Sequence, residues 1–453
     1  MLPKLRAMAT ASVWVVVLAS CTKTANDKVL FSEQQTSSNK KVEIADVQEE
    51  SLPGEIIVQF KNDLTQDKKN SIIQKINGKV KGKTKTKRIP GFESEEDILL
   101  VQVDGDVQSA ISKAKSFSSE IEYAEPNYLY HSTEVSNDPY FTGLALWGMR
   151  NAGYGSHADE QWAKGNIGSN TVYVGIIDQG YMYAHDDLKD NAGVNPGEIP
   201  DNGIDDDGNG YIDDVYGWDF ANGDNTVDDG NEFHGTHVAG TIGAKGGNGI
   251  GVAGVVWKVK ILSGKFLIGN SGSSFSAVEA IDYFINLKQK QGLNIVALNN
   301  SWGGGVDSRS LKNAIRRASR AGIMFIAAAG NNARDNDVYP FYPSNYNLAN
   351  MISVSSINSS GGLSYFSNYG SRTVDIAAPG ESIASTYLLN TYAWFSGTSM
   401  ATPHVTGAVA LYASLHPNDS FRAIKKNILS DGVATPALSG KTITGNRLDV
   451  SKF

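Results

Sequence analysis

From about Asn137 onward, short runs rich in aliphatic and β-branched residues alternate with stretches whose apolar residues recur at helical spacing. The β-rich runs are residues 172–177, 259–262, 294–298 and 323–327. The helical stripes between them are Phe275, Val278, Ile281, Phe284 and Ile285, then Leu311, Ile315 and Ala318. Strands that alternate with helices build a buried parallel sheet. The pattern therefore predicts an α/β domain over residues 137–453 with a mostly parallel central sheet.

A smaller unit precedes this domain, at residues 52–133. Extended runs at 56–60, 98–103 and 121–124 alternate with a helical stretch containing Ile72, Ile73 and Ile76 and with a helix from about Val107 to Ser116. This order suits a two-layer α+β unit. Its lysine-rich run, from Lys79 to Arg88, could form a binding patch, but such runs are more often solvated, and we expect a solvated loop.

The N-terminus reads as a targeting segment. Lys4 and Arg6 precede an apolar run at residues 9–19, which is too short to span a bilayer and predicts a signal peptide over residues 1–20. Residues 18–21 (LASC) resemble the lipobox of bacterial lipoproteins, which implies lipidation of Cys21 and membrane attachment through that anchor alone. The polar stretch at 21–51 is expected to be a tether.

Charge and cysteine content limit the possible partners. The chain has 48 acidic and 40 basic residues, a formal net charge of −8, so it lacks the positive field that nucleic acids require. Cys21 is the only cysteine, so no internal disulfide forms, and stability must come from core packing or bound ions.

Three segments carry the residue types of nucleophilic catalysis. Asp178 ends the first long strand, His234 begins the segment HGTHVAGT, and Ser399 lies in GTSMATPHV. In the last segment the serine opens a helix whose first turn we expect to contain Pro403, with the positive helix end directed at the serine oxygen. This order and these surroundings resemble the subtilisin-like serine peptidases, over nearly the whole chain from Asn137.

The resemblance implies a subtilisin-like three-layer fold and a secreted serine endopeptidase. Ser399 would be the nucleophile, His234 the general base, and Asp178 the group that orients the imidazole. Residues 328–331 (AAGN) resemble the segment of the oxyanion hole, with Asn331 donating its side-chain amide. His237 and His404 also lie inside the motifs, and we expect buried structural roles for them.

Two further segments resemble substrate-binding walls. Residues 300–304 (NSWGG) form an edge that would pair with an extended peptide, and residues 341–344 (FYPS) lie near the primary specificity pocket of the family. The expected substrate-binding residues are Ser301, Trp302, Gly303 and Phe341. Protein or peptide substrates are the expected partners, and we expect a monomer.

Two calcium sites are expected. Residues 205–214 (DDDGNGYIDD) place oxygen ligands at alternating positions around a glycine turn, but the twelfth position is Tyr216 instead of a bidentate glutamate. The resemblance implies a second site. The expected ligands are Asp205, Asp207, Asn209 and Asp213 in the first site, and Asp187, Asn248, Ile250 and Val252 in the second.

The same resemblance identifies residues 52–133 as a propeptide that packs on the catalytic domain and inhibits it in cis. Cleavage is expected between about Tyr130 and Asp138, which would release the mature enzyme from an anchor at Cys21. We therefore expect export, with the precursor held as a lipoprotein of the bacterial cell envelope.

Two other functions are compatible with parts of this pattern. A catalytically silent, calcium-binding surface lipoprotein would use the same fold. Such proteins usually lose a nucleophile or base, whereas this chain keeps the residues of all four catalytic positions, 178, 234, 331 and 399. A hydrolase with a Gly-x-Ser-x-Gly elbow would have the order Ser, Asp, His, whereas this chain has Asp, His, Ser.

Overall fold

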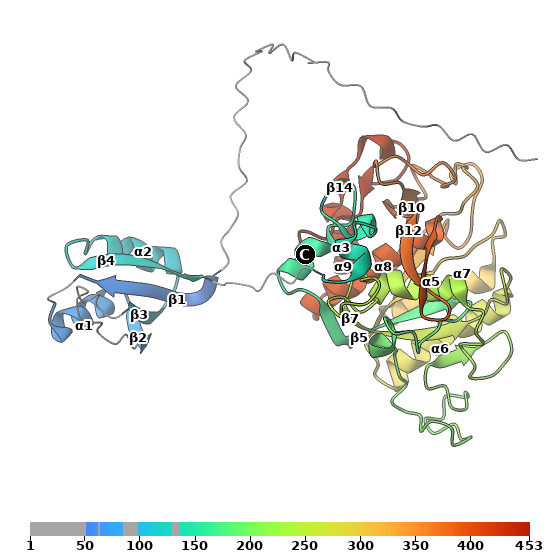
Figure 1. The fold of residues 1–453 in the computed structure, drawn as a ribbon, viewed down its shortest axis with the longest axis horizontal. Coiled ribbons are helices and arrows are strands. Elements are labelled where there is room, and N and C mark those ends of the chain that lie inside the picture. The colour runs from blue at the N-terminus through green and yellow to red at the C-terminus, as the bar shows by residue number, and fades with distance from the viewer. Residues whose placement is uncertain (1–50, 62–63, 85–97, 129–135) are drawn as a thin grey trace, which may run out of the picture. The chain divides into compact units, whose positions relative to one another are not determined.

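The computed structural model describes residues 51–61, 64–84, 98–128 and 136–453 (Figure 1). The chain forms two compact units, residues 1–129 and 130–453, and each is described by itself. The predicted signal peptide, Cys21, nearly all of the predicted tether and most of the expected cleavage region lie outside the described residues. Within the described part of the chain, no helix is both long enough and apolar enough to cross a membrane.

The first unit is a four-stranded antiparallel sheet with two helices. Its elements are β1 (Ser51–Phe60), α1 (Gln66–Lys75), β2 (Gly78–Lys83), β3 (Ile98–Val103), α2 (Val107–Lys115) and β4 (Ile121–Tyr128). The strand order is β2-β3-β1-β4. Side chains of both helices and of β1, β3 and β4 share one apolar cluster. The Thr65 and Asp106 side chains cap α1 and α2 by accepting backbone N–H bonds. This confirms the predicted α+β unit.

The loop predicted for the lysine-rich run is wrong over its first half. Residues 78–83 form β2, which pairs antiparallel with β3 at the edge of the sheet. The strand is mostly exposed, so it lacks the apolar alternation by which strands are found in a sequence. Lysines are common on edge strands because their charge opposes pairing with another chain. Residues 85–88 lie outside the described part of the chain.

The second unit contains a nine-stranded sheet in the order β14-β15-β11-β10-β9-β8-β5-β7-β6. All neighbouring strands are parallel except β14 and β15. The strands of the sheet are β5 (Gly168–Asp178), β6 (Gly217–Asp219), β7 (Lys258–Lys265), β8 (Ile295–Asn300), β9 (Met324–Ala328), β10 (Met351–Ile357), β11 (Ile376–Pro379), β14 (Val433–Ala434) and β15 (Asn446–Arg447). A separate hairpin consists of β12 (Ile383–Tyr387) and β13 (Thr391–Phe395).

Helices cover both faces of this sheet, which gives the predicted three layers. The helices are α3 (Pro139–Thr142), α4 (Ala158–Ala163), α5 (Phe233–Gly243), α6 (Ser274–Lys290), α7 (Arg309–Arg320), α8 (Thr398–Leu415) and α9 (Phe421–Asp431). Ile176 of β5 belongs to an apolar cluster with α5 and α8, whereas the next residue, Ile177, belongs to a cluster with α6 and α7. Successive strand residues point to opposite faces, so β5 is packed on both sides.

The order of the strands determines where a site can form. After β5 the chain forms β6 and then β7 on one side of β5, and through α6 it returns to add β8 on the other side. Such a reversal opens a crevice at the carboxyl ends of the strands, where α/β proteins bind their ligands. Asp178 is the last residue of β5, so it lies at this crevice.

Candidate active site

Asp178 and His234 are joined by a hydrogen bond. Asp178 is fully buried, and its Oδ1 lies 2.8 Å from Nδ1 of His234. His234 is the second residue of α5, and its side chain is 22% exposed. The helix approaches β5 closely because residue 235 is glycine: a Cβ there would lie 1.8 Å from the Gly180 carbonyl oxygen. The small residue thus brings the imidazole within reach of the buried carboxylate.

The environment of His234 favours its protonated form. Burial lowers the pKa of His234, but the charge of Asp178 and the hydrogen bond to it raise that pKa by more, so the pKa lies above its usual value. A positive charge that forms on this imidazole is therefore stabilised.

Ser399 is the second residue of α8, and it lines the same recess as His234 and Asn331. Its hydroxyl donates to the Ser301 carbonyl oxygen at 3.0 Å. The predicted place of Pro403 in the first turn is wrong, because α8 begins at Thr398 and Pro403 is its sixth residue. A proline there cannot donate to the Ser399 carbonyl. That carbonyl instead accepts from the Ser301 hydroxyl at 2.9 Å, so it is not left without a hydrogen-bond donor.

Asn331 follows β9 and is held by Thr398. Its Oδ1 accepts from the backbone N–H and the hydroxyl of Thr398, at 2.8 and 2.9 Å. The Thr398 hydroxyl also accepts from the Gly330 N–H. These contacts occupy the oxygen of the amide, so its N–H₂ end is the part left to act as a donor. Thr398 was not among the predicted site residues, although its place directly before Ser399 was a signal.

A recess of about 360 Å³ unites these groups. Residues lining it include His234, Asn331 and Ser399, together with an aromatic wall of Phe233, Trp394 and Phe395. A carbonyl group in this recess would have a hydroxyl, an imidazole and an amide donor around it, which is the set of groups that acyl transfer needs.

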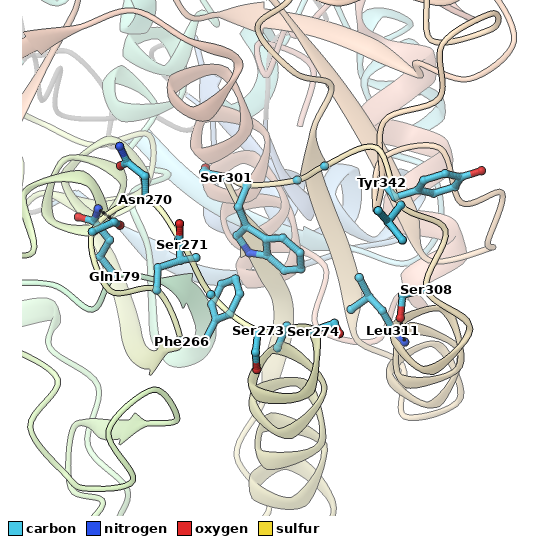
Figure 2. Close-up of a pocket in the computed structure, with 18 of the residues that line it drawn as sticks. Gln179, Phe266, Asn270, Ser271, Ser273, Ser274, Ser301, Ser308, Leu311 and Tyr342 are labelled. Carbon is cyan, nitrogen blue, oxygen red and sulfur yellow. Dashed lines mark hydrogen bonds between the residues drawn. The ribbon is translucent and has the colours of Figure 1, made fainter.

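A second, larger cavity of about 640 Å³ also reaches His234. Figure 2 shows its walls, with Phe266 and Leu311 among the side chains that line it. Three of the predicted substrate-binding residues, Ser301, Trp302 and Gly303, line this cavity. The lining of the cavity exposes more apolar than polar surface, so it suits an apolar substrate side chain.

The fourth predicted substrate-binding residue, Phe341, lies next to this cavity. Its ring packs between two glycines: an added Cβ would lie 2.4 Å from the ring at Gly303 and 3.2 Å from it at Gly330. Gly330 precedes Asn331, so the ring packs against the segment that carries the amide donor.

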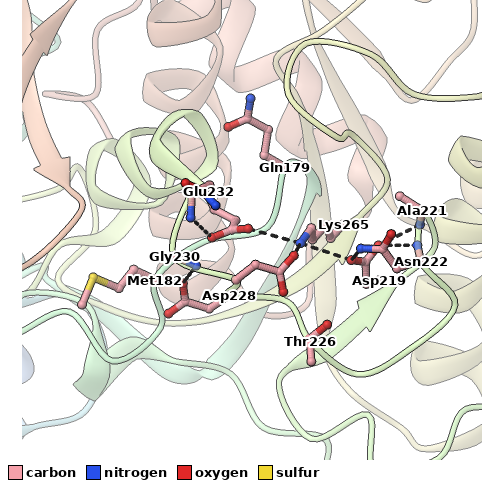
Figure 3. Close-up of polar contacts among 12 residues, drawn as sticks. Gln179, Met182, Asp219, Ala221, Asn222, Thr226, Asp228, Gly230, Glu232 and Lys265 are labelled. Carbon is pink, nitrogen blue, oxygen red and sulfur yellow. Dashed lines mark hydrogen bonds and ion pairs between the residues drawn. The ribbon is translucent and has the colours of Figure 1, made fainter.

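A buried lysine, Lys265, lies at the end of β7 (Figure 3). Lys265 pairs in register with Asp178, and its side chain is 4% exposed. Its ammonium lies 3.2 Å from both Asp219 and Glu232 and also contacts Asp229. Burial lowers the pKa of Lys265, but the three carboxylates raise it by more, so it stays charged. Glu232 immediately precedes α5, so the ion pair ties the start of the His234 helix to the sheet.

The acidic loop at residues 205–214 brings oxygen ligands together, and Glu198 joins them although the sequence spacing did not indicate it. Carboxylate oxygens of Glu198, Asp205 and Asp207 lie within 4.8 Å of one another. Asn209 hydrogen-bonds through its N–H to both aspartates, whereas Asp213 accepts N–H bonds from residues 202 and 203. A donor set of oxygens alone fits Ca²⁺. Glu198 lies seven residues before Asp205, the first residue of the acidic segment, so no EF-hand spacing points to it.

The second expected calcium site also forms one cluster. Asp187 accepts from the Asn248 side chain and from the Val252 N–H, each at 2.9 Å. The N–H of Ile250 donates to Asn248 Oδ1. Asp138 was not among the predicted residues; it is a buried carboxylate that accepts backbone N–H bonds from residues 247–249.

His237 and His404 are buried, as expected for structural residues. Burial is the main cause that lowers the pKa of His237 to about 3 and that of His404 to about 4. Both rings are therefore neutral at pH 7. His237 contacts the backbone carbonyls of Ile383 and Ala393 in the β12–β13 hairpin.

Comparisons with known proteins agree with this geometry. The family model described as the subtilase family matches residues 169–440, and the one described as the fervidolysin N-terminal prodomain matches residues 37–127. The chain is 33% identical over 371 residues to "Thermophilic serine proteinase" of Bacillus sp. strain AK1, covering 81% of this chain and 80% of that protein. It is 37% identical to "Thermitase" of Thermoactinomyces vulgaris, covering 61% of this chain and 85% of that one.

A solved structure, "Proteases from Pseudoalteromonas arctica PAMC 21717", superposes with a TM-score of 0.56 at 27% identity, covering 70% of this chain and 98% of that one. The order of the motifs, the fold and the relatives all indicate the same family. The chain belongs to the subtilase family and is a subtilisin-like serine protease with an N-terminal prodomain of the fervidolysin type.

Proposed function

We propose that the protein is an exported serine endopeptidase in which Asp178, His234 and Ser399 form the catalytic triad. The observation that carries this proposal is the recess that His234, Asn331 and Ser399 line together, with Asp178 bound to the far side of the imidazole.

The chemistry follows from these positions. Ser399 Oγ attacks the scissile carbonyl carbon while His234 Nε2 takes its proton, and His234 Nδ1–H stays bonded to Asp178. The Asn331 amide donates to the oxyanion that forms. The C–N bond then breaks as His234 returns the proton to the leaving amine, and water hydrolyses the acyl-enzyme by the same route. The Ser399 hydroxyl must first turn from Ser301 toward the imidazole, and such bonds often tighten only when substrate binds.

Proteins and peptides are the proposed substrates. His234 lines both cavities, so an extended chain lying across them would pass the imidazole in mid-chain, as endopeptidase cleavage requires. Ser301, Trp302 and Gly303 would contact one side of this chain. Phe341 would limit the size of the residue accepted beside Asn331, because its ring fills the space between two glycines.

The proposal includes synthesis as a self-inhibited precursor. Residues 52–133 would be the inhibitory propeptide and residues 137–453 the peptidase domain. Ser136 and Asp138 are buried and bonded to each other, and Asp138 is also held by residues 247–249. This anchorage supports a cleavage point on the N-terminal side of Ser136.

Calcium would stabilise the peptidase domain without taking part in the reaction. Glu198, Asp205, Asp207 and Asn209 would hold one ion in the acidic loop, with Asp213 ordering its turn. Asp187, Asn248 and the carbonyls of Ile250 and Val252 would hold the other. Ions that bind only the native state raise the free energy of unfolding by mass action.

Export rests on the sequence of the N-terminus. Residues 1–20 would direct the chain across the membrane and Cys21 would carry a lipid. Cleavage before Ser136 would then free the peptidase domain from its anchor. Labelling with a radioactive fatty acid, compared between wild type and Cys21→Ser, tests the anchor.

Active-site labelling tests the chemistry. A fluorophosphonate that reacts with activated serines should modify Ser399 in the processed enzyme and not in His234→Ala, with casein hydrolysis lost in proportion to labelling. Modification at another serine, or casein hydrolysis that survives complete labelling of Ser399, would refute the assignment.

A further inference from the structure

Gln179 follows Asp178 and connects three parts of the site. It is 4% exposed and lines the larger cavity (Figure 2). Its backbone N–H donates to Asp178 Oδ1 at 2.8 Å. Its side-chain oxygen accepts from the backbone N–H of His234 at 3.2 Å, and its side-chain nitrogen donates to the Gly269 carbonyl at 2.6 Å.

The first of these side-chain contacts acts on the catalytic helix. The first N–H groups of a helix have no partner within it, and Glu232, which precedes α5, makes no side-chain capping bond. The amide oxygen of Gln179 satisfies one of them, at the residue that carries the imidazole. Figure 3 shows Gln179 and the Lys265–Glu232 pair at this end of the helix, so the start of α5 is held from two strand ends.

The second contact acts on the wall of the substrate cavity. Residues 268–271 form an exposed turn closed by two backbone hydrogen bonds between Ile268 and Ser271. Gly269 and Ser271 line the 640 Å³ cavity. Gly269 lies at the tip of the turn with a φ of +57°, and its carbonyl is the atom bound by Gln179.

We propose that Gln179 is a positioning residue that couples the cavity wall at residues 268–271 to His234, so that a substrate side chain filling the cavity speeds the reaction at Ser399. This rests on the proposed function. Since one planar amide makes both contacts, a displacement of the turn moves the acceptor that holds the His234 N–H. The substrates that benefit are extended peptides with an apolar side chain long enough to enter the cavity that Phe266 and Trp302 line.

The two contacts can be separated by substitution. Gln179→Glu keeps an acceptor for the His234 N–H but replaces the donor to Gly269 by an oxygen that the carbonyl repels. Gln179→Met has similar length and lacks both contacts. The matched control is Gln291→Glu, because Gln291 also donates its side-chain amide to a loop carbonyl, that of Asp207, away from the cavity.

The measurement uses a nested series of peptide anilides, from two to five residues, with an apolar residue at the distal end. Assays run in saturating calcium at the pH where each variant's rate is maximal. For each enzyme, kcat/KM is divided by its own value on the shortest substrate, so the quantity compared is the gain on lengthening. In wild type we expect a stepwise gain when the apolar residue first reaches the cavity.

Gln179→Glu should reduce this gain by roughly two- to tenfold, the range that one net hydrogen bond supports. Gln179→Met should reduce the gain and also lower kcat on the shortest substrate, whereas Gln291→Glu should keep the wild-type gain. An undiminished gain in Gln179→Glu, or an equal loss at every substrate length in both Gln179 variants, would overturn the coupling. If wild type hydrolyses none of the anilides while folded, the proposed function itself fails.

Discussion

The buried Lys265 makes a stability prediction whose size follows from its surroundings. Replacing it by methionine keeps the length of the side chain but leaves Asp219, which is fully buried, and Glu232, which is 3% exposed, without their cation. Breaking a buried ion pair in this way destabilises by about 3–5 kcal/mol. Asp229 is 39% exposed, so water replaces its contact and it adds little. At ~2 °C per kcal/mol, the Tm of the peptidase domain should fall by about 6–10 °C.

Calorimetry at one scan rate tests this in the full chain lacking residues 1–21, with Ser399→Ala present to prevent self-digestion. The control is Arg317→Met. The Arg317–Asp282 pair is more than 40% exposed on both sides, so its loss should cost below about 1 kcal/mol. The raised pKa of Lys265 means that its contribution is present at all pH values below about 10.4 and is lost only as the pH rises through the folded-state pKa. Equal Tm losses in the two variants, or a loss under 2 °C for Lys265→Met, would refute the reasoning.

Other expectations concern activity and metal. Asn331→Ala should lower kcat by about 10²–10³-fold with little change in KM, the range found for removing an oxyanion donor in a subtilisin; a loss below tenfold in steady-state assays would argue against that role. The acid limb of kcat/KM against pH should lie above about pH 6.5, since Asp178 raises the pKa of His234 and only the neutral imidazole accepts a proton; a midpoint near 5 would contradict this. Phe341→Ala should raise the rate for bulky residues over alanine at the cleavage position by on the order of tenfold, measured with matched anilides, and an unchanged ratio counts against its role. EDTA should lower the Tm, and Glu198→Gln should shrink that shift; equal shifts in wild type and variant would remove Glu198 from the ligand set.

The sequence predicted the fold where its patterns are strong. Buried parallel strands read as continuous apolar runs, so β5, β7, β8 and β9 were found in the sequence. By contrast, β10 carries three serines in MISVSSI and was missed, although all seven residues are buried. The hydroxyl of one of them, Ser356, bonds to that of Ser364, and only tertiary structure reveals such a partner.

The same distinction between local sequence patterns and long-range contacts applies to the site residues. Asp178, His234, Asn331 and Ser399 lie in local motifs, and motif order was enough to nominate them. Lys265 could not be found in this way, because its partners Asp219 and Glu232 come from other elements and give no spacing signal. Long-range packing of side chains, unlike strand periodicity, leaves no local trace in a sequence.

The most direct test of the catalytic assignment compares wild type with Ser399→Ala, both produced without residues 1–21 in calcium buffer. Intact mass and casein hydrolysis are measured on the same samples. The account predicts that wild type is cut on the N-terminal side of Ser136 and degrades casein, whereas Ser399→Ala stays full length and inert. A folded wild type that remains intact and inactive, or a Ser399→Ala variant that still processes itself and digests casein, would contradict it.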